Sequence, residues 1–115
     1  MPRLMSVSHT EQQVVDRSKT VTRRKGWRFL KVGDRLTLCR KVMGRKGAPL
    51  VRLAEVEVVH VHVGPLWEIE QDIDDPAREG FPAMSSTEFV EFFCATFGGD
   101  EDQIVTRIEW VYLDE

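Results

Sequence analysis

The sequence predicts an α+β domain, a small β-barrel covered by two or three helices, and three observations lead to this fold class. Segments rich in valine and threonine recur along the chain, as is typical of short strands. A serine followed three residues later by a glutamate, the pattern of a helix start, occurs twice. The length of 115 residues suits one domain, residues 1–115, with a core of its own.

The expected strands follow from runs of residues that favour extended backbone. The longest run, residues 49–63, changes the phase of its apolar alternation between Val58 and Val59. Such a change predicts a bulge or a barrel corner. The motif GRKG at residues 44–47 has the composition of a hairpin turn. We therefore expect strands at residues 2–7, 19–24, 35–43, 49–63 and 103–114.

Two helices are expected from capping boxes, in which a serine and a glutamate three residues later each bond to the other's backbone. Ser8 and Glu11 predict a helix that ends at about Asp16. Ser85 and Glu88 predict a second helix. The apolar residues of the second helix recur at helical spacing and are expected in the core; they are Phe89, Val90, Phe93, Cys94 and Phe97.

The composition is typical of a soluble globular protein, with 42% hydrophobic and 30% charged residues. No apolar run approaches the roughly 20 residues of a membrane-spanning helix, and the N-terminus lacks the apolar stretch of a signal peptide. We therefore expect a cytoplasmic protein with no membrane association. Cys39 and Cys94 form no CxxC pair, so reduced core thiols are expected. The sequence leaves the oligomeric state open, and a monomer is the simplest expectation.

The formal net charge of −3 hides a division of charge along the chain. Residues 17–52 contain thirteen lysines or arginines and one acid, a net +12, whereas residues 53–115 contain two arginines and sixteen acids, a net −14. If the fold keeps these segments apart, one face attracts polyanions and another repels them. If the segments interleave, their charges neutralise each other. Both arrangements are open at the level of sequence.

The basic segment SKTVTRRKGW, residues 18–27, has the composition of a nucleic-acid interface. Cations beside an aromatic residue contact phosphates and stack on bases. The alternatives are an edge strand protected by charge, and a tryptophan that packs on the core. The candidate nucleic-acid-binding residues are Arg23, Arg24, Lys25, Trp27, Arg28, Arg40, Arg45 and Lys46.

Several motifs taken together resemble the ASCH domain, a family similar to the PUA-like β-barrels that are associated with RNA. They are Lys19-Thr20-Val21-Thr22-Arg23-Arg24, Val32-Gly33-Asp34, Glu79-Gly80-Phe81, a helix, and a closing VTRIEWVYL. Compact stand-alone members of this family occur in bacteria and phages. The resemblance implies a PUA-like barrel whose partner is RNA, single-stranded nucleic acid or a modified nucleoside. It also implies a cytoplasmic setting, that of the host if the protein is phage-encoded.

The ASCH family includes RNA-binding modules, a ribonuclease, and an amidohydrolase that removes the acetyl group from N4-acetylcytidine. The resemblance implies that the lysine and second threonine of the amidohydrolase motif correspond to Lys19 and Thr22. The glutamate of that branch, which precedes the last long helix, corresponds to Glu79. The amidohydrolase branch has an apolar residue where this chain has Arg23, so the substrate pocket differs at that position.

The three implied catalytic residues form a chemically consistent set. A threonine hydroxyl needs a base in order to act as a nucleophile, and a lysine serves as that base when desolvation or nearby cations lower its pKa. A carboxylate such as Glu79 then carries a proton or orients the substrate. Because side chains alternate along a strand, Lys19 and Thr22 can converge only if Lys19 lies at the helix-to-strand turn.

Two other groups of residues have some, but not all, of the features of a metal site. His60 and His62 share a strand face at a spacing that can bind metal, but no third ligand is near them in sequence. The acidic run EIEQDIDD, residues 68–75, lacks the glycine and the terminal glutamate of a calcium loop. We interpret this run as a solvated flank. We therefore expect no metal and no other cofactor.

Two functional hypotheses follow from these observations. The first is a domain that binds RNA, a nucleotide or a nucleoside in a basic cleft around KTVTRR. The second is a hydrolase, either an amidohydrolase of N4-acetylcytidine-like nucleosides or a ribonuclease. A barrel that serves only as an interaction scaffold is a third possibility. The observation that bears most on this choice is whether Lys19, Thr22 and Glu79 line one concave pocket.

Overall fold

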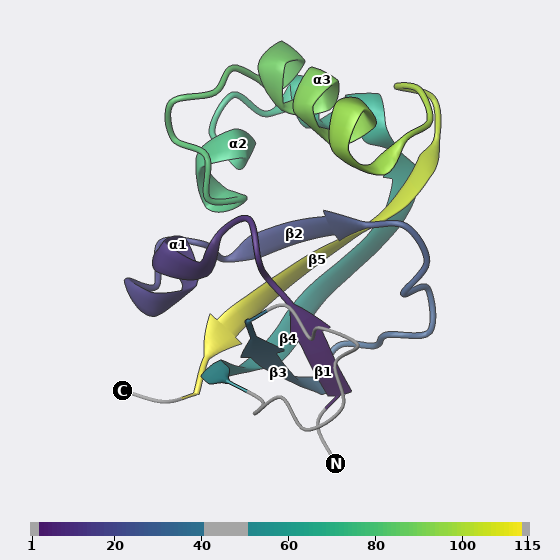
Figure 1. Ribbon diagram of the computed structural model, residues 1–115. Helices are drawn as coiled ribbons and strands as arrows, with labels where there is room; N and C mark the ends of the chain where they lie inside the picture. Colours follow the sequence, from purple (N-terminus) through teal and green to yellow (C-terminus); the bar gives the residue numbers. More distant parts are fainter. Residues whose placement is uncertain (1–2, 41–50, 114–115) are drawn as a thin grey trace, which may run out of the picture.

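The computed structural model describes residues 3–40 and 51–113, and their strands form one curled sheet with helices packed on it (Figure 1). The sheet has five strands in the order β1-β3-β4-β5-β2. The strands are β1 (Arg3–Ser6), β2 (Val21–Arg24), β3 (Arg35–Cys39), β4 (Arg52–Pro65) and β5 (Ile104–Tyr112). The helices are α1 (Glu11–Val15), the 3-10 helix η1 (Leu66–Gln71), α2 (Asp75–Arg78) and α3 (Ser86–Phe97).

Strand pairing leaves β1 and β2 at the two edges of the sheet. β1 is parallel to β3, and all the other pairs are antiparallel. The sheet curls into a half-barrel, which confirms the predicted α+β class (Figure 1). A side chain connects the two edges of the sheet. Arg24 of β2 donates from Nη2 to the backbone oxygen of Ser6 at the end of β1.

The predicted irregularity in the longest strand is confirmed. The register of β4 against β5 shifts between Val58 and His60, so Val59 is the extra residue of a bulge. A bulge bends the strand that contains it and increases the local twist. On its N-terminal side β4 pairs with both β3 and β5, and beyond the bulge it pairs with β5 alone.

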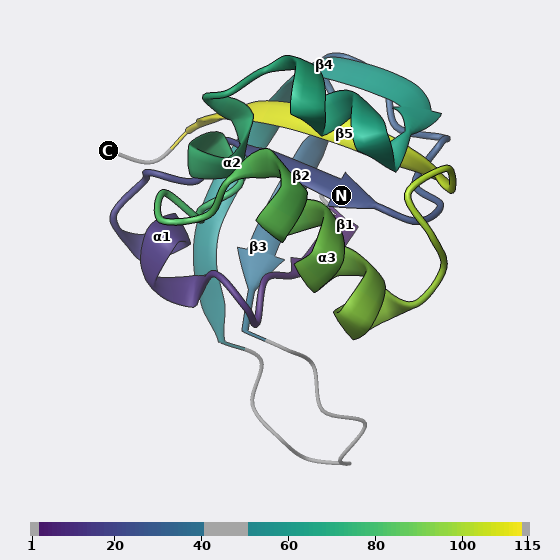
Figure 2. The same ribbon diagram turned by 90° about the horizontal axis from the view of Figure 1, so that it is seen from above.

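Two hydrophobic clusters make up the core. The first fills the inside of the curled sheet and includes Leu36, Val56, Val58 and Trp110. The second lies between α3, η1 and the start of β5, beyond the β2 edge of the sheet in Figure 1. Seen from above, α3 crosses over the β1 and β2 region (Figure 2). The two edge strands therefore lie where the two clusters meet.

One of the two predicted capping boxes is confirmed and the other is wrong. At α3 the Glu88 amide donates to the Ser85 hydroxyl at 3.1 Å, and the Ser85 amide donates to the Glu88 carboxylate at 2.8 Å. At α1 the helix begins after Thr10, whose side chain makes no capping bond. The Thr10 amide bonds to the Val7 carbonyl at 2.9 Å, so Ser8 lies in a turn before the helix.

The apolar stripe of α3 is confirmed except at its end. Phe89, Val90 and Phe93 are buried, and Cys94 is half-buried. Phe97, which was expected in the core, is 47% exposed. It is the last residue of the helix, and the chain turns away directly after it at Gly98, which has a φ of 85°.

The interpretation of residues 68–75 as a solvated flank is confirmed for residues 70–74 but is wrong for Ile69 and Asp75. Ile69 is buried within η1, and Asp75 is 1% exposed at the start of α2, a helix that the sequence analysis did not predict. Pro76 follows Asp75 in the first turn, where its fixed φ favours helix initiation. The exposed part of the run is limited to residues 70–74.

Three further predictions concern isolated features. The GRKG turn, with Arg45 and Lys46, lies outside the described residues. Cys39 and Cys94 are free cysteines, as expected. Among the helices of the described ranges, none is long and apolar enough to cross a membrane.

Candidate functional site

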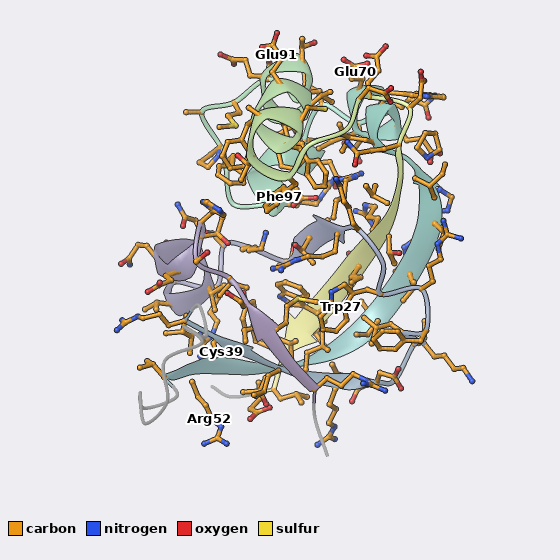
Figure 3. All side chains as sticks on the ribbon, turned by 45° about the vertical axis from the view of Figure 1, so that its right-hand side comes forward. Trp27, Cys39, Arg52, Glu70, Glu91 and Phe97 are labelled. Carbon is orange, nitrogen blue, oxygen red and sulfur yellow. The ribbon has the colours of Figure 1, made fainter. Side chains whose placement is uncertain are left out.

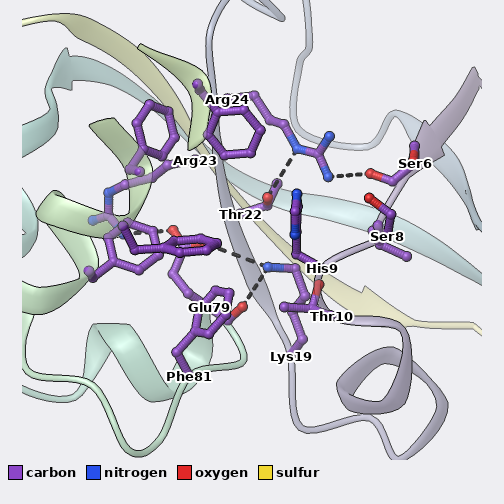
Figure 4. Close-up of a pocket in the computed structure, with 15 residues that line it drawn as sticks. Ser6, Ser8, His9, Thr10, Lys19, Thr22, Arg23, Arg24, Glu79 and Phe81 are labelled. Atoms are coloured by element: carbon purple, nitrogen blue, oxygen red, sulfur yellow. Dashed lines mark hydrogen bonds and ion pairs between the residues drawn. The ribbon is translucent and has the colours of Figure 1, made fainter. Parts of the chain in front are cut away.

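A pocket of about 250 Å³ lies between the turn before α1, strand β2 and helix α3 (Figure 4). It is bordered by Val7 of the first hydrophobic cluster and by Phe89 and Phe93 of the second. Polar and charged side chains line the pocket together with phenylalanines. Its lining includes all three residues of the predicted catalytic set: Lys19, Thr22 and Glu79.

Lys19 reaches the pocket because it lies at the turn between α1 and β2. Arg17 has a left-handed backbone with a φ of 69°, which redirects the chain after the helix. The Lys19 carbonyl accepts hydrogen bonds from the Trp110 indole at 3.2 Å and from the Tyr112 hydroxyl. These bonds fix the Lys19 backbone to β5. Lys19 thus lines the same pocket as Thr22 because it lies at the helix-to-strand turn, as the alternation of side chains along a strand required.

The amine of Lys19 is buried and is held by Glu79. Its Nζ donates to the Glu79 backbone oxygen at 2.6 Å and lies 3.6 Å from Oε1 of the same residue. Burial lowers the pKa of Lys19 to about 8 against the opposing charge of Glu79, and the guanidinium groups of Arg24 and Arg23 add to the lowering. A large fraction of Lys19 is therefore neutral at mildly alkaline pH.

Glu79 is placed by the short helix α2, which it follows directly. Its amide donates to the Asp75 carbonyl at 2.9 Å. Its buried carboxylate accepts from Arg23 Nη1 at Oε2, at 2.9 Å, while Oε1 faces Lys19. Gly80, with a φ of 102°, turns the chain directly afterwards, a conformation that favours glycine.

Arg23, where this chain departs from the amidohydrolase pattern, is buried in a network of ion pairs. Its Nη1 lies 2.6 Å from Oδ2 of Asp75 as well as 2.9 Å from Glu79. Asp75 also accepts two bonds from Arg107, at 3.1 and 2.9 Å, and one from Arg78 at 3.1 Å. Burial opposes ionisation of Asp75, but the Arg107 and Arg23 contacts outweigh it and hold its pKa well below the usual range.

Thr22 and Arg24 lie two residues apart on β2 and therefore face the same side of the strand. Arg24 Nε donates to Thr22 Oγ1 at 3.2 Å (Figure 4). Because the threonine oxygen accepts this bond, its own hydrogen remains available for donation. A cation at this position also stabilises negative charge that develops on the oxygen.

Aromatic rings also form a wall of the pocket. The ring centroids of Phe81 and Phe92 are 5.0 Å apart, and those of Phe93 and Phe97 are 4.9 Å apart. His9, in the turn before α1, stands edge-on to Phe92 and Phe97 with centroid distances of 5.8 and 5.9 Å. The pocket thus combines aromatic rings, on which a flat ring can stack, with hydrogen-bonding groups.

The other predicted nucleic-acid-binding residues are dispersed. Lys25 is exposed, and its Nζ donates to the carbonyl of the last residue of α3 at 2.6 Å. Arg28 is exposed, and Arg40 pairs with Glu11 at 3.0 Å. Trp27 is half-buried and packs against the first hydrophobic cluster (Figure 3). Of the two alternatives for this residue, the structure therefore favours packing on the core.

The basic and acidic parts of the sequence interleave in the fold. Lys19 and Arg23 both contact Glu79, and Arg35 lies 3.8 Å from Glu57 on the neighbouring strand. The net +12 of residues 17–52 is therefore partly neutralised by acids from residues 53–115. The sequence left open whether the basic and acidic segments lie apart or interleave, and these contacts show that they interleave.

His60 and His62 have separate partners. His60 Nδ1 lies 3.4 Å from Nη1 of Arg107, and His62 Nε2 lies 3.0 Å from Oε1 of Glu68. Within residues 3–40 and 51–113, no three side chains of His, Cys, Asp or Glu gather as they would around a metal ion.

Sequence reasoning missed Asp75, His9 and the phenylalanine wall as parts of the site. Pro76 after Asp75 is a helix-start signal that could have separated Asp75 from its acidic neighbours. Phe89 and Phe93 were recognised as core residues, but their spacing says nothing about a pocket on the same face. His9 is an isolated histidine, and no sequence signal marks it.

No family model matches the chain, and no curated protein matches it. Solved structures do share its fold. Protein EF3133 from Enterococcus faecalis V583, described under DUF984, has a TM-score of 0.67 and 17% identity over 99% of this chain and 77% of its own. The ASCH protein from Zymomonas mobilis has a TM-score of 0.62 and 15% identity over 94% of this chain and 65% of its own. Hypothetical protein PH0355 has a TM-score of 0.68 and 16% identity over 98% of this chain and 100% of its own. The chain therefore has the fold of ASCH-domain proteins.

Proposed function

We propose that the pocket binds one nucleobase, either of a free nucleoside or of a nucleotide in a single strand, with KTVTRR providing its polar side. The observation that carries this proposal is that hydrogen-bonding groups and aromatic rings line the same pocket. Lys19, Thr22 and Arg24 offer the hydrogen-bonding groups, and phenylalanines offer the aromatic surface. Nucleobases have a flat aromatic face and polar edges, and proteins recognise unpaired bases by stacking and by bonds to those edges.

The size and charge of the pocket agree with this ligand class. A volume of about 250 Å³ lies just below the roughly 300–1,000 Å³ typical of drug-sized ligands, which suits a single base or nucleoside. Arg23 is occupied by Asp75 and Glu79, so it is unsuited to bind phosphate. Arg24 lies at the two edge strands and is the cation best placed to meet a ribose or phosphate group.

Removing one ring of the stacking wall should weaken nucleoside binding. We expect Phe92→Ala to bind cytidine or N4-acetylcytidine about tenfold more weakly than the wild type, because stacking on an aromatic ring contributes roughly 1–3 kcal/mol per base. Titration calorimetry measures this difference. The control is Ile73→Ala, which removes an apolar side chain that is 89% exposed outside the pocket and should leave the affinity unchanged. Equal losses in both variants, or no nucleoside binding by the wild type at millimolar concentrations, would contradict the proposal.

A second candidate function is hydrolysis of an acyl amide on the bound base, and the lowered pKa of Lys19 favours it. Thr22 Oγ1 would attack the acyl carbon while Lys19 Nζ takes the hydroxyl proton and passes it to the departing amine nitrogen. Water then cleaves the acyl-threonine ester and releases the acid, with Glu79 as the proton carrier. Arg24, bonded to the threonine oxygen, stabilises the attacking group.

The hydrolysis hypothesis predicts a rate that rises with pH. A lysine acts as a base only when neutral, so with a pKa of about 8 for Lys19 the rate should increase between pH 7 and pH 9 and then level off. Cytidine release from N4-acetylcytidine, followed at several pH values, measures this profile. A flat profile over that range would exclude Lys19 as the base.

Variants of the catalytic set should fail as one unit. We expect Lys19→Ala, Thr22→Ala and the double variant each to lose about 10²–10⁴ in rate, with no further loss in the double variant. Short RNAs should be assayed in parallel, because strand cleavage would identify the ribonuclease alternative. If the wild type turns over neither substrate, hydrolysis is rejected and nucleobase binding stands as a separate proposal.

A further inference from the structure

A second hollow, of about 320 Å³, lies at the N-terminal end of β1 and is separate from the pocket described above. It is lined by Arg3 of β1, by Phe29, Lys31 and Asp34 of the loop between β2 and β3, and by Arg35 of β3, around the buried Leu30. None of the functional residues considered so far lines it. Its contacts indicate what kind of ligand it suits.

The hollow combines an exposed aromatic ring with cations. Phe29 is 51% exposed, although aromatic rings of this size are usually covered. The Arg3 guanidinium lies 4.4 Å from the centre of the Phe29 ring, and the Trp27 ring lies on Phe29 at 5.5 Å and 32°. The Lys31 side chain is exposed beside them. Stacked aromatic and guanidinium groups with free cations are typical of surfaces that bind single-stranded nucleic acid.

The acids near this hollow are engaged and leave the cations in excess. Asp34 uses its carboxylate to accept the Lys31 amide at 2.9 Å, which closes the loop. Glu57 lies 3.8 Å from Arg35, whose side chain is 61% exposed and therefore mostly hydrated. Arg3 and Lys31 have no ion pair with an acid among the described residues. The hollow thus favours an anionic ligand.

Strand β1 connects the hollow to the pocket. Arg3, the first residue of β1, lines the hollow, and Ser6, the last, lines the pocket and accepts a bond from Arg24. Three residues of strand span roughly 10 Å, which adjacent units of an extended nucleic-acid strand can bridge. β1 is an edge strand, so no other strand of the described ranges covers its outer side.

We propose that this hollow is a second nucleotide subsite, in which Phe29 and Arg3 stack on a base and Lys31 and Arg35 contact the phosphates of the same single strand. The inference rests on the proposed function, because the neighbouring base of that strand enters the pocket. The protein thereby recognises a base within a single-stranded nucleic acid and binds a free nucleoside more weakly.

The test compares a nucleoside with oligonucleotides on matched variants. Calorimetry measures the affinities of cytidine, a four-nucleotide oligocytidylate RNA and its DNA counterpart. We expect the wild type to bind the oligonucleotides at least tenfold more tightly than cytidine. The double variant Arg3→Gln/Phe29→Ala should lose about tenfold or more in oligonucleotide affinity and keep its cytidine affinity. The control Arg52→Gln removes an exposed cation that pairs with Cys39, at the end of β3 away from Arg35. This variant should keep most of the preference for oligonucleotides over cytidine.

The outcomes separate the two proposals. If cytidine binds but oligonucleotides bind no more tightly, or if the double variant loses no more oligonucleotide affinity than Arg52→Gln, the second subsite is rejected and the nucleobase pocket stands. If neither cytidine nor any oligonucleotide binds, both proposals fail. A wild-type preference for RNA over DNA supports the subsite with the ribose 2′-hydroxyl as an added contact. Equal binding of RNA and DNA supports the subsite with stacking and phosphate contacts alone.

Discussion

Asp75→Ala should be among the most destabilising single substitutions in this protein, with a loss of about 3–5 kcal/mol in the free energy of unfolding. Asp75 is 1% exposed and accepts bonds from Arg23, Arg78 and Arg107. Its removal leaves the buried Arg23 with Glu79 as its only carboxylate partner among the described residues. Urea unfolding of the variant against the wild type measures the loss.

Asp72→Ala is the matched control for Asp75→Ala. Both aspartates bond to the same nitrogen of Arg78, but the Asp72 side chain is 49% exposed, so its loss should stay below about 1 kcal/mol. The effect of Asp75 should also depend on pH. Its pKa is depressed in the folded state, so its contribution is complete above the unfolded pKa of about 4 and is lost as the pH falls. Equal losses for the two variants at pH 7 would show that the buried network does not stabilise the fold.

Phe93→Ala should cost about 3–5 kcal/mol, the range observed when a buried phenylalanine ring is removed from a core. Phe93 is 2% exposed and belongs to the second hydrophobic cluster, which holds α3 to η1 and β5. Its ring also borders the pocket, so the cavity that it leaves joins the existing space. Thermal and urea unfolding measure the loss.

Phe97→Ala controls for the removal of a ring from the same helix. The Phe97 ring packs against the Phe93 ring, with centroids 4.9 Å apart, but Phe97 is 47% exposed, so we expect a loss of about 1 kcal/mol or less. If Phe93→Ala also costs less than about 1 kcal/mol, the second hydrophobic cluster is not the core that we describe. Such a result would also show that the packing of α3 contributes little to the free energy of unfolding of the domain.

Most of the fold could be predicted because local signals and burial agree along the chain. The change of phase at Val58 and Val59 predicted the bulge, and the Ser85 box predicted the start of α3. The error at Ser8 has a local cause. Ser8 and Glu11 match the capping-box pattern, but the chain first turns between Val7 and Thr10. The N-cap of the helix is therefore Thr10, two residues after Ser8.

The candidate site was predicted only in part, because its decisive contacts join residues that are distant in sequence. The resemblance to the ASCH family led to Lys19, Thr22 and Glu79, which line one pocket. The role of Asp75 depends on Arg23, which lies more than fifty residues earlier. A charge pattern along the chain cannot show which acid meets which base. The basic segment therefore suggested a surface, although its central arginine is buried.

The buried ion-pair network limits how this protein could be engineered. In many domains a buried ion pair can be replaced by well-packed apolar residues with no loss, or with a gain, of stability. Here the Arg23 guanidinium that completes the network also holds one oxygen of Glu79, and the other oxygen faces Lys19. An apolar replacement of Arg23 and Asp75 would release that carboxylate from its fixed orientation. Selection for thermostability alone would therefore favour variants that unfold at higher temperature but whose pocket has lost its arranged charges.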